Sequence, residues 1–342
     1  MMPENGISKT TGEFIQGIDV LEDYILHLDT DLLRNLLIDR TTYRNILWAT
    51  TDYESLGAGY EEYSEILPEL ITGERATVIQ PRITKTQYAQ CGRTRDKAEV
   101  FTPSWICNKQ NNLIDAQWFG RPDVFNTETE TGWASTVGKI VFPAAKKTWK
   151  KYVDAQRLEI SCGEAPYLVS RYDTVTGVKI PLEQRIGLLD RKMRVVNENA
   201  VSDDEWLTWT LRAFQSVYGY EYQGDSLLLA RENLLYTFID YYRTRFEHTP
   251  DIPWLRKIAR IISWNIWQMD GLKYVVPNTC RSIREELNTL FGIEIKEEPC
   301  PGCATEDIFA HTGTYCKIQD WRFKTSRRFI SMMKGGKSCA RL

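Results

Sequence analysis

Residues 217–235 read VYGYEYQGDSLLLARENLL and contain the clearest structural pattern of the chain. The first six are rich in aromatic, β-type residues and predict a strand at Val217–Tyr222. A turn follows, after which Asp225 or Ser226 can cap a helix. Apolar residues then recur on one face of that helix: Leu227, Leu234, Phe238 and Tyr241. A strand that leads into a long amphipathic helix is typical of α/β proteins.

Two other segments resemble strands that end in a turn. Leu158–Ile160 precedes the small-residue stretch SCGEAP at 161–166, and Ile261–Trp267 precedes Asp270. Helical patterns separate all three strand candidates. Alternating strands and helices favour a parallel, doubly wound sheet.

The N-terminal part has a different pattern. Residues 16–40 carry apolar side chains at helical spacing, Ile46–Trp48 is a short strand candidate, and 76–83 is an extended stretch that Pro81 limits to a sheet edge. We therefore expect an acidic, mainly helical domain at 1–95 and an α/β core at 96–290. Residues 291–342 form a third, small segment.

Composition sets the broad class of the protein. The chain has 342 residues with a formal net charge of −3, and 42% of its residues are hydrophobic. No run approaches the ~18 apolar residues of a membrane span, and the N-terminus lacks the blocks of a signal peptide. We expect a cytoplasmic protein without a membrane partner, whose eight cysteines are free thiols or metal ligands. The 11 Trp and 17 Tyr supply either core packing or stacking surfaces for bases.

Three residues follow the three strand candidates in the order that a nucleoside cofactor requires. Gly163 allows the backbone to approach a ligand, Glu221 can accept both hydroxyls of a ribose, and Asp270 can accept from an adenine amino group. Each also has a structural interpretation, as a turn glycine, a helix cap or a surface acid. Their common position after a strand is what indicates a cofactor site.

Several segments resemble class I methyltransferases that modify adenine in DNA. Glu221 is followed by Ala230-Arg231-Glu232-Asn233-Leu234, as in that family, and Phe101-Thr102-Pro103 matches its Phe-x-Thr-Pro segment. Ser161, Cys162, Gly163 and Leu168 match its glycine-rich turn, whereas Ala165 stands where the family has a second glycine. The resemblance covers about residues 96–275.

The resemblance implies a Rossmann-like class I methyltransferase sheet that binds S-adenosylmethionine. Phe101, Thr102 and Pro103 would close over the methionine end of the cofactor, and Ser161, Cys162 and Gly163 would form the turn beneath it. Glu221 would hold the ribose and Asp270 the adenine. A nicotinamide dehydrogenase is disfavoured because no G-x-G-x-x-G follows a strand.

The family's catalytic motif, Asn/Asp/Ser-Pro-Pro-Tyr/Phe, holds an adenine flipped out of the duplex. The sequence contains no such tetrapeptide. Asp320-Trp321-Arg322-Phe323 is the nearest match, with an acid and an aromatic residue at the right spacing but neither proline. Asp320, Trp321 and Phe323 are the catalytic candidates. The alternative is an acid beside a core tryptophan.

The C-terminal segment suggests a metal and a nucleic acid. Cys300, Cys303, His311 and Cys316 follow a C-x2-C-x7-H-x4-C pattern, which is compatible with a structural zinc ion or with free thiols in a turn. The last 26 residues carry one acid, Asp320, and eight basic residues: Lys317, Arg322, Lys324, Arg327, Arg328, Lys334, Lys337 and Arg341. This basic end either contacts DNA phosphates or is a solvated tail.

Together these features predict a DNA adenine methyltransferase of a restriction–modification or mobile-element system, which transfers a methyl group from S-adenosylmethionine to adenine N6. The absence of the catalytic tetrapeptide keeps an alternative open. In that alternative the chain is a catalytically inactive DNA-binding or regulatory subunit, with a restriction or specificity subunit as its partner.

Overall fold

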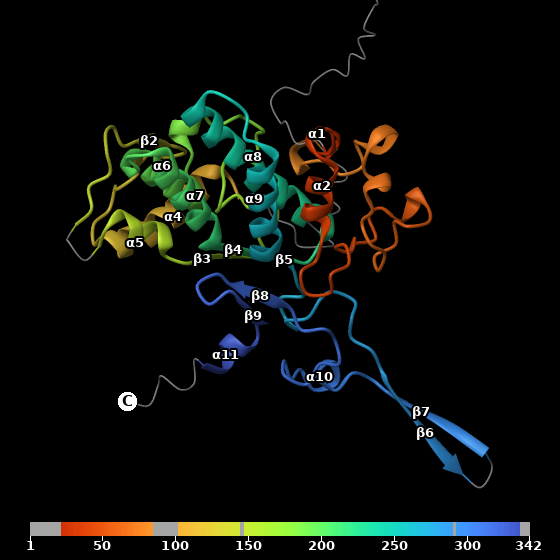
Figure 1. Cartoon of the computed structure of the whole chain (residues 1–342). Helices are drawn as coiled ribbons and strands as arrows, with labels where there is room; N and C mark the ends of the chain where they lie inside the picture. Colours follow the sequence, from red (N-terminus) through yellow and green to blue (C-terminus); the bar gives the residue numbers. More distant parts are fainter. Residues whose placement is uncertain (1–21, 85–101, 144–146, 290–291, 336–342) are drawn as a thin grey trace, which may run out of the picture.

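The computed structural model describes residues 22–84, 102–143, 147–289 and 292–335. In this part the protein is a mixed α/β structure in which the helices gather on one side of a small sheet (Figure 1). None of the described helices is both long enough and apolar enough to span a bilayer.

The central sheet has three parallel strands, β3 (Arg157–Ile160), β4 (Val217–Glu221) and β5 (Ile266–Gln268), with β4 in the middle. The first two strands lie where the sequence predicts them. The third was predicted at Ile261–Trp267, but helix α9 (Ile252–Asn265) occupies most of that segment. A continuous apolar run fits a buried helix as well as a strand, and here α9 begins at Ile252-Pro253 and extends to the strand without a break.

Helices connect these strands on one face of the sheet. Helices α6 (Leu188–Asn199) and α7 (Asp203–Gln215) join β3 to β4, whereas α8 (Gly224–Phe246) and α9 join β4 to β5 (Figure 1). The opposite face carries a hairpin, β8 (Lys317–Asp320) and β9 (Thr325–Arg328). Trp267 of β5 packs there in one cluster with Ile318 and Phe329. The described residues therefore lack the second helical layer expected of a doubly wound sheet.

Helix α8 is buried on nearly all sides, rather than being amphipathic as its apolar spacing predicts. Its polar residues Arg231, Glu232 and Asn233 are buried together with the apolar residues. The guanidinium of Arg231 donates to backbone carbonyl oxygens of Leu36 and Ile266. These polar contacts let a helix with few exposed residues occupy the centre of the structure.

The N-terminal region contains two helices, α1 (Glu22–Leu28) and α2 (Thr30–Leu37), because Asp29 interrupts the predicted helix and caps α2. Leu33 and Leu37 of α2 belong to the same hydrophobic core as α8 and α9. The predicted strand at Ile46–Trp48 is reduced to an isolated bridge between Leu47 and Glu65.

The predicted extended stretch at 76–83 consists of turns that run into a short 3-10 helix. The 3-10 helices of this region are η1 (Glu54–Leu56), η2 (Pro68–Leu70), η3 (Gly73–Arg75) and η4 (Arg82–Thr84). These turns also contribute to the main core, in which Trp48, Ile66 and Ile71 are fully buried.

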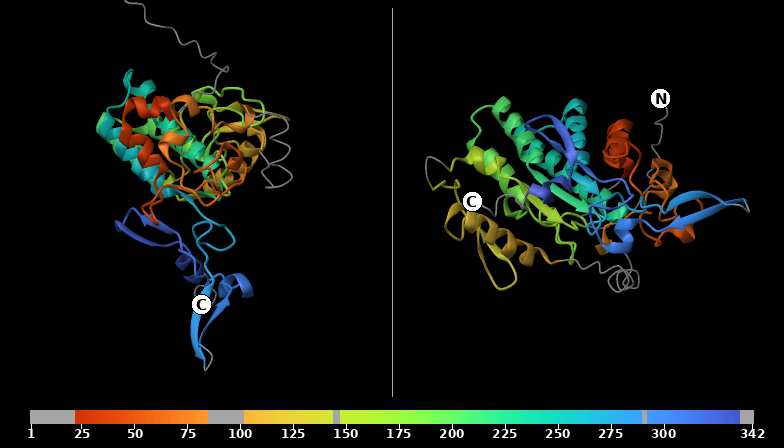
Figure 2. Two further views of the ribbon diagram at one scale, coloured as in Figure 1. Left: turned by 90° about the vertical axis from the view of Figure 1, so that its right-hand side faces the viewer. Right: turned by 90° about the horizontal axis from the view of Figure 1, so that it is seen from below.

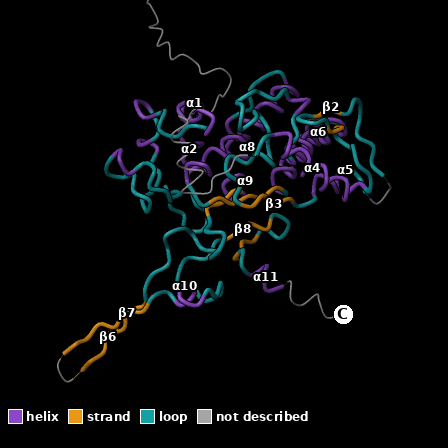
Figure 3. The backbone as a smooth tube through the Cα atoms, turned by 180° about the vertical axis from the view of Figure 1, so that it is seen from behind, coloured by secondary structure: helices purple, strands orange, loops and turns teal. Residues whose placement is uncertain are grey.

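Smaller elements complete the chain. On the helical side these are α4 (Ser104–Phe119), the hairpin β1 (Asn126–Glu128) with β2 (Trp133–Ser135), α5 (Trp149–Asp154) and the 3-10 helix η5 (Leu182–Gln184). On the other side, β6 (Ile283–Thr289) and β7 (Gly292–Glu298) form a long hairpin that projects from the body (Figures 2 and 3). Helices α10 (Pro301–Thr305) and α11 (Ser331–Gly335) flank the C-terminal strands.

Two buried carboxyl groups, one on α1 and one on α8, lie close enough for the charge of Glu22 to affect the pKa of Glu232. Glu22 and Glu232 are 1% and 0% exposed. Burial raises the pKa of Glu22 to about 8, and burial together with the charge of Glu22 raises the pKa of Glu232 well above its ordinary value. A carboxyl group with a raised folded-state pKa stabilises the fold fully below its unfolded pKa, and this contribution is lost as the pH rises through the folded pKa.

We therefore predict that the free energy of unfolding falls as the pH rises from about 4.5 to about 8. Glu232→Gln should remove much of this fall and stabilise the protein at pH 8 by on the order of 2 kcal/mol. Urea unfolding at pH 5 and pH 8 measures the difference. The exposed substitution Glu74→Gln should leave the pH dependence unchanged, and equal slopes for Glu232→Gln and wild type would contradict the prediction.

Candidate functional site

Gly163 and Glu221 meet at the carboxyl ends of β3 and β4. The backbone N–H of Gly163 donates to Oε2 of Glu221 at 2.8 Å. The N–H groups of Tyr222 and Gln223 donate to Oε1 of the same carboxylate, at 2.7 and 3.3 Å. Burial raises the pKa of Glu221 despite these three hydrogen bonds. The carboxylate thus fixes the turn after one strand to the end of its neighbour.

Asp270 lies beside this pair, two residues beyond β5. The N–H of Met269 donates to the carbonyl oxygen of Glu221 at 2.9 Å, which places Asp270 next to the end of β4. Its Oδ1 accepts from the N–H groups of Leu272 and Lys273, at 3.0 and 3.1 Å. The structure therefore brings Gly163, Glu221 and Asp270 to one edge of the sheet, where both acids also stabilise the local backbone.

The turn after β3 has three residues in the left-handed backbone region: Ser161 (φ 47°), Gly163 (φ 52°) and Ala165 (φ 63°). Ala165, at the position where the resembling family has a glycine, adopts the conformation that favours glycine. A non-glycine residue pays on the order of 1 kcal/mol for it. Strain of this kind persists where the surrounding structure holds the backbone in place.

Buried acids hold this turn, and the sequence did not identify them. Glu159 of β3 accepts hydrogen bonds from the N–H groups of Tyr167 and Leu168, at 3.3 and 3.1 Å, and burial raises its pKa to about 8. Glu164 accepts from the hydroxyl of Tyr172 at 2.6 Å. Glutamates placed two residues before and one residue after Ser161-Cys162-Gly163 are the pattern that could have drawn attention to them.

Further contacts lock the same turn to the core. Asn233 of α8 donates to the carbonyl oxygen of Glu164 at 3.2 Å. The side chain of Cys162 is buried, and burial raises its pKa well above the ordinary value. Cys162 is therefore a packing residue in its thiol form, which agrees with a role in shaping the turn.

The Phe-Thr-Pro segment lies only partly in the described structure, because Phe101 falls outside the described residues. Pro103 is the N-cap of α4. The carbonyl oxygen of Thr102 accepts from the hydroxyl of Thr174 at 3.2 Å, and the N–H of Ser104 donates to Asp173 at 2.7 Å. The segment thus packs on the loop that continues from the Gly163 turn.

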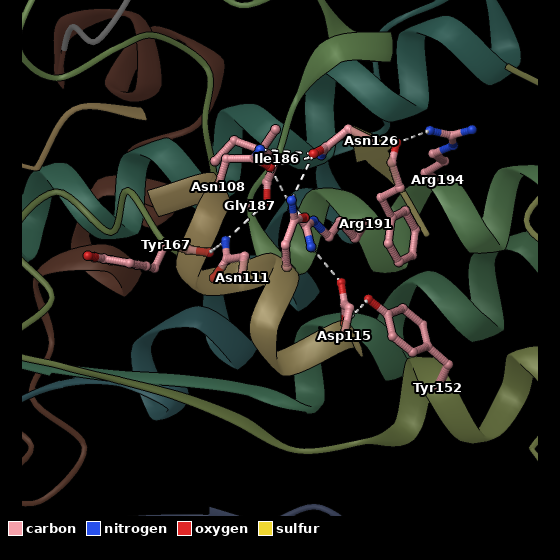
Figure 4. Close-up of polar contacts among 12 residues, drawn as sticks. Asn108, Asn111, Asp115, Asn126, Tyr152, Tyr167, Ile186, Gly187, Arg191 and Arg194 are labelled. Atoms are coloured by element: carbon pink, nitrogen blue, oxygen red, sulfur yellow. Dashed lines mark hydrogen bonds and ion pairs between the residues drawn. The ribbon is translucent and has the colours of Figure 1, made fainter. Parts of the chain in front are cut away.

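A buried polar network positions α4 (Figure 4). Arg191 of α6 forms an ion pair with Asp115 at 2.6 Å and donates to Asn108 at 2.8 Å. Tyr152 donates to the other oxygen of Asp115 at 3.0 Å, and Asn111 donates to the carbonyl oxygen of Tyr167 at 3.0 Å. The last contact connects the network to the turn region and so attaches α4 to it.

The predicted catalytic residues do not converge on a site. Oδ1 of Asp320 accepts from the turn N–H groups of Arg322 and Phe323, and Oδ2 accepts from Arg327 at 2.6 Å. The indole of Trp321 donates to Asn265 at 2.8 Å and packs against the main core, whereas Phe323 is 78% exposed.

Their position also separates them from the strand-end site. Arg322 pairs with Asp154, which precedes β3, and Trp321 contacts the residue before β5. Asp320, Trp321 and Phe323 therefore lie at the amino ends of the strands, opposite Gly163 and Glu221. Asp320 ends β8, and Trp321 and Phe323 lie in the turn of the β8–β9 hairpin, so the structure does not bring the predicted catalytic residues next to Gly163 and Glu221.

The structure contains a cluster of candidate metal ligands, which differs from the predicted set by one residue. Cys280, Cys300, Cys303 and His311 place their ligand atoms within 4.8 Å of one another, so this Cys3His cluster could hold a metal ion. Cys316, the predicted fourth ligand, is fully buried elsewhere and donates its Sγ–H to the carbonyl oxygen of Gln268 at 3.3 Å. Cys280 takes its place because the β6–β7 hairpin brings residues 280 and 300 together.

The imidazole of His311 lies equally far from all three cysteines of the cluster. Nδ1 of His311 is 3.7 Å from the Sγ atom of each of the three cysteines. The N–H of Thr312 donates to Sγ of Cys300 at 3.2 Å. Burial opposes ionisation of the Cys300 thiol, but the hydrogen bonds from Thr312 prevail and lower its pKa to about 5. Only glycine fits at Gly302, because a Cβ would lie 2.6 Å from the backbone N and Nδ1 of His311.

The basic end forms the β8–β9 hairpin and α11, except for Lys337 and Arg341, which lie outside the described residues. Arg322 and Arg327 form ion pairs with Asp154 and Asp320. These partners are not in the acidic N-terminal region.

No family model, curated protein or solved structure matches this chain.

The strain at Ala165 gives a stability prediction. Ala165→Gly should leave the free energy of unfolding within about 0.5 kcal/mol of wild type, because relief of the left-handed backbone offsets the lost methyl packing. Ala165→Val should cost about 3 kcal/mol, since a β-branched residue resists this conformation. Urea unfolding compares the two variants, and a glycine variant as unstable as the valine variant would refute the assignment.

The revised ligand set gives a second prediction. The purified chain should hold about one metal ion, and Cys280→Ser should lower that content and the melting temperature together. Cys316→Ser is the matched control, since it removes a thiol that lies outside the cluster, and it should retain the metal. Elemental analysis of the three proteins decides whether Cys280 or Cys316 is a metal ligand. If the Cys316 variant alone loses its metal, the ligand set predicted from the sequence is correct.

Proposed function

We propose that the chain is an S-adenosylmethionine-binding subunit of a DNA adenine methyltransferase system. The observation that carries the proposal is the contact between Gly163 and Glu221, which joins the ends of two neighbouring parallel strands. Ligands of open α/β sheets bind outside the carboxyl ends of the strands, with a tight turn beneath them and an acid on the ribose. The DNA adenine substrate follows from the sequence resemblance.

The other contacts agree with such a site. Oε1 of Glu221 already accepts two N–H donors and Oε2 accepts one, so Oε2 keeps a lone pair for a ribose hydroxyl. Within the described part of the chain, the one partner of Asp270 Oδ2 is Lys273, in an ion pair at 3.6 Å. This oxygen is free to accept from an adenine amino group. Thr102 and Pro103 begin a helix that is anchored to the turn region.

The strand order supports the same proposal. β3, β4 and β5 lie side by side in chain order, with helices in each connection. This is the arrangement of one half of a Rossmann-like sheet. S-adenosylmethionine supplies the methyl group when bound. The residues named above would bind and orient it.

A specific observation favours a non-catalytic subunit over a self-sufficient enzyme. Asp320, Trp321 and Phe323 lie at the amino ends of the strands, and their polar atoms are engaged in the hairpin turn and in the contact with Asn265. In this form of the proposal the chain contributes the cofactor site. A restriction or specificity subunit would act on the DNA with it.

We further propose that the Cys3His cluster holds zinc. Bond lengths of about 2.3 Å to sulfur and 2.0 Å to nitrogen in a tetrahedron place these atoms ~3.5 Å apart. The three S···N distances of 3.7 Å match this value. A Cys3His set with no open position serves a structural role.

Calorimetry with S-adenosylmethionine tests the cofactor site. Glu221→Gln should weaken binding by about 30-fold, because ~2 kcal/mol of charged hydrogen bonding to the ribose is lost. The control Asp204→Asn changes an exposed acid on α7 and should bind like wild type. Thermal melts must show that both variants are folded.

The outcome then separates the two forms of the proposal. Binding together with methyl transfer to mixed-sequence DNA identifies an enzyme, and binding without transfer identifies a cofactor-binding subunit. If the folded wild-type chain binds neither S-adenosylmethionine nor its demethylated product, the proposal fails.

A further inference from the structure

The β6–β7 hairpin forms an arm that stands away from the rest of the molecule in every view (Figures 1, 2 and 3). Its strands pair from Ile283↔Glu298 to Thr289↔Gly292. No other described strand pairs with either edge, and Ile295 is 63% exposed. A two-stranded hairpin alone is marginally stable, and its open edges favour association. The arm therefore has the properties of a surface that binds another protein, and nothing in the described structure covers it.

The metal cluster fixes the arm to the body. Cys280 precedes β6 by three residues, and Cys300 follows β7 by two. A metal ion held by these residues would join both strands at their base. The arm would then project in a defined direction.

The charge of the arm indicates what it can contact. Residues 283–298 contain five glutamates and two basic residues, a net charge of −3. The two basic residues form ion pairs within the arm, Arg284 with Glu297 at 3.6 Å and Lys296 with Glu298 at 2.7 Å. Glu285 and Glu286 are exposed and make no ion pair within the described structure. Such an arm repels DNA and fits a basic protein surface.

A basic surface of this kind lies on the β8–β9 hairpin. Residues 317–328 contain five basic residues and one acid, a net charge of +4. Lys324 and Arg328 are exposed, and neither has an ion-pair partner among the residues described. Exposed apolar side chains lie nearby, with Leu158 and Met332 both 45% exposed. They line a cavity of about 150 Å³ together with Arg327 and Phe329.

The arm of the same chain does not cover this surface, because it projects away from β8–β9 (Figure 1). We propose that two copies of the chain exchange arms. Each acidic arm lies across the basic β8–β9 hairpin and the neighbouring apolar face of the other copy. The same pair of surfaces is then used twice about a two-fold axis, which closes the dimer. A covered hairpin cannot contact phosphates, so the dimer and a DNA complex formed through that hairpin exclude each other.

Charge exchange between two variants tests the proposal. The arm variant carries Glu285→Lys and Glu286→Lys, and the hairpin variant carries Lys324→Glu and Arg328→Glu. The substitutions change the net charge of the arm from −3 to +1 and that of the hairpin from +4 to 0. Each variant alone places like charges at the substituted positions of both contacts, so its dimer dissociation constant should rise by about tenfold or more. Mixed in equal amounts, the variants pair the two lysines of the substituted arm with the two glutamates of the substituted hairpin, and a native arm with a native hairpin. Both contacts are then restored.

Sedimentation of the full chain measures the result, with Glu130→Lys on the β1–β2 turn as a control that changes the surface charge outside both contacts. We expect a wild-type dimer that weakens with salt, weaker association of each variant alone, and recovery in the mixture. A wild-type chain that stays monomeric, or a mixture that stays as dissociated as its components, overturns the proposal. Metal content and melting temperature must match wild type, which excludes misfolding as the cause. Because this test requires no cofactor, failure of S-adenosylmethionine binding leaves its outcome unaffected.

Discussion

The packing of the N-terminal helices onto the sheet depends on one buried guanidinium, that of Arg231. It donates to the carbonyl oxygens of Ile266, Ile38 and Leu36, the last at 2.5 Å. These carbonyls lie at or near the ends of α2 and α9, where helices leave backbone acceptors without partners and carry a partial negative charge. Burial lowers the pKa of Arg231 to about 9, and the carbonyls compensate its charge. The same contacts hold α2, α8 and α9 together around β5.

The position of α8 then determines the strand-end site. The helix begins at Gly224, directly after Glu221, and a Cβ at Gly224 would lie 2.0 Å from the carbonyl oxygen of Leu47. The N-terminal chain therefore passes very close to the start of α8. Gln268 completes the contact by donating to the carbonyl oxygens of Leu47 and Tyr222, both at 2.8 Å. Residues of the N-terminal region therefore form one side of the proposed cofactor site. A separate N-terminal domain would not make this contact.

Local patterns predicted the β4–α8 unit and the residues at the three strand ends, because strand, turn and helix follow one another without long-range contacts. The third strand was misplaced, since the apolar run at 261–267 satisfies a buried helix as well as a strand. Cys280 was missed as a metal ligand because it lies twenty residues before Cys300, and only the intervening hairpin brings the two together. Spacing favoured Cys316, which is nearer in the chain but packs under the sheet. The spacing of cysteines in the sequence therefore does not show which of them a hairpin brings together in the folded chain.

The two ends of the sheet carry different groups of residues. Gly163 and Glu221 lie at the carboxyl end, whereas Asp320 and its hairpin lie at the amino end, and the four residues of β3 between them span about 13 Å. Direct methyl transfer needs the acceptor atom in contact with the donor, so residues separated by a whole strand cannot serve one reaction. The hairpins and the metal cluster are better suited to binding a macromolecule. Because the hairpin rests on the sheet through Trp267 and Phe329, a partner bound there contacts the same strands that carry the proposed cofactor site at their other end.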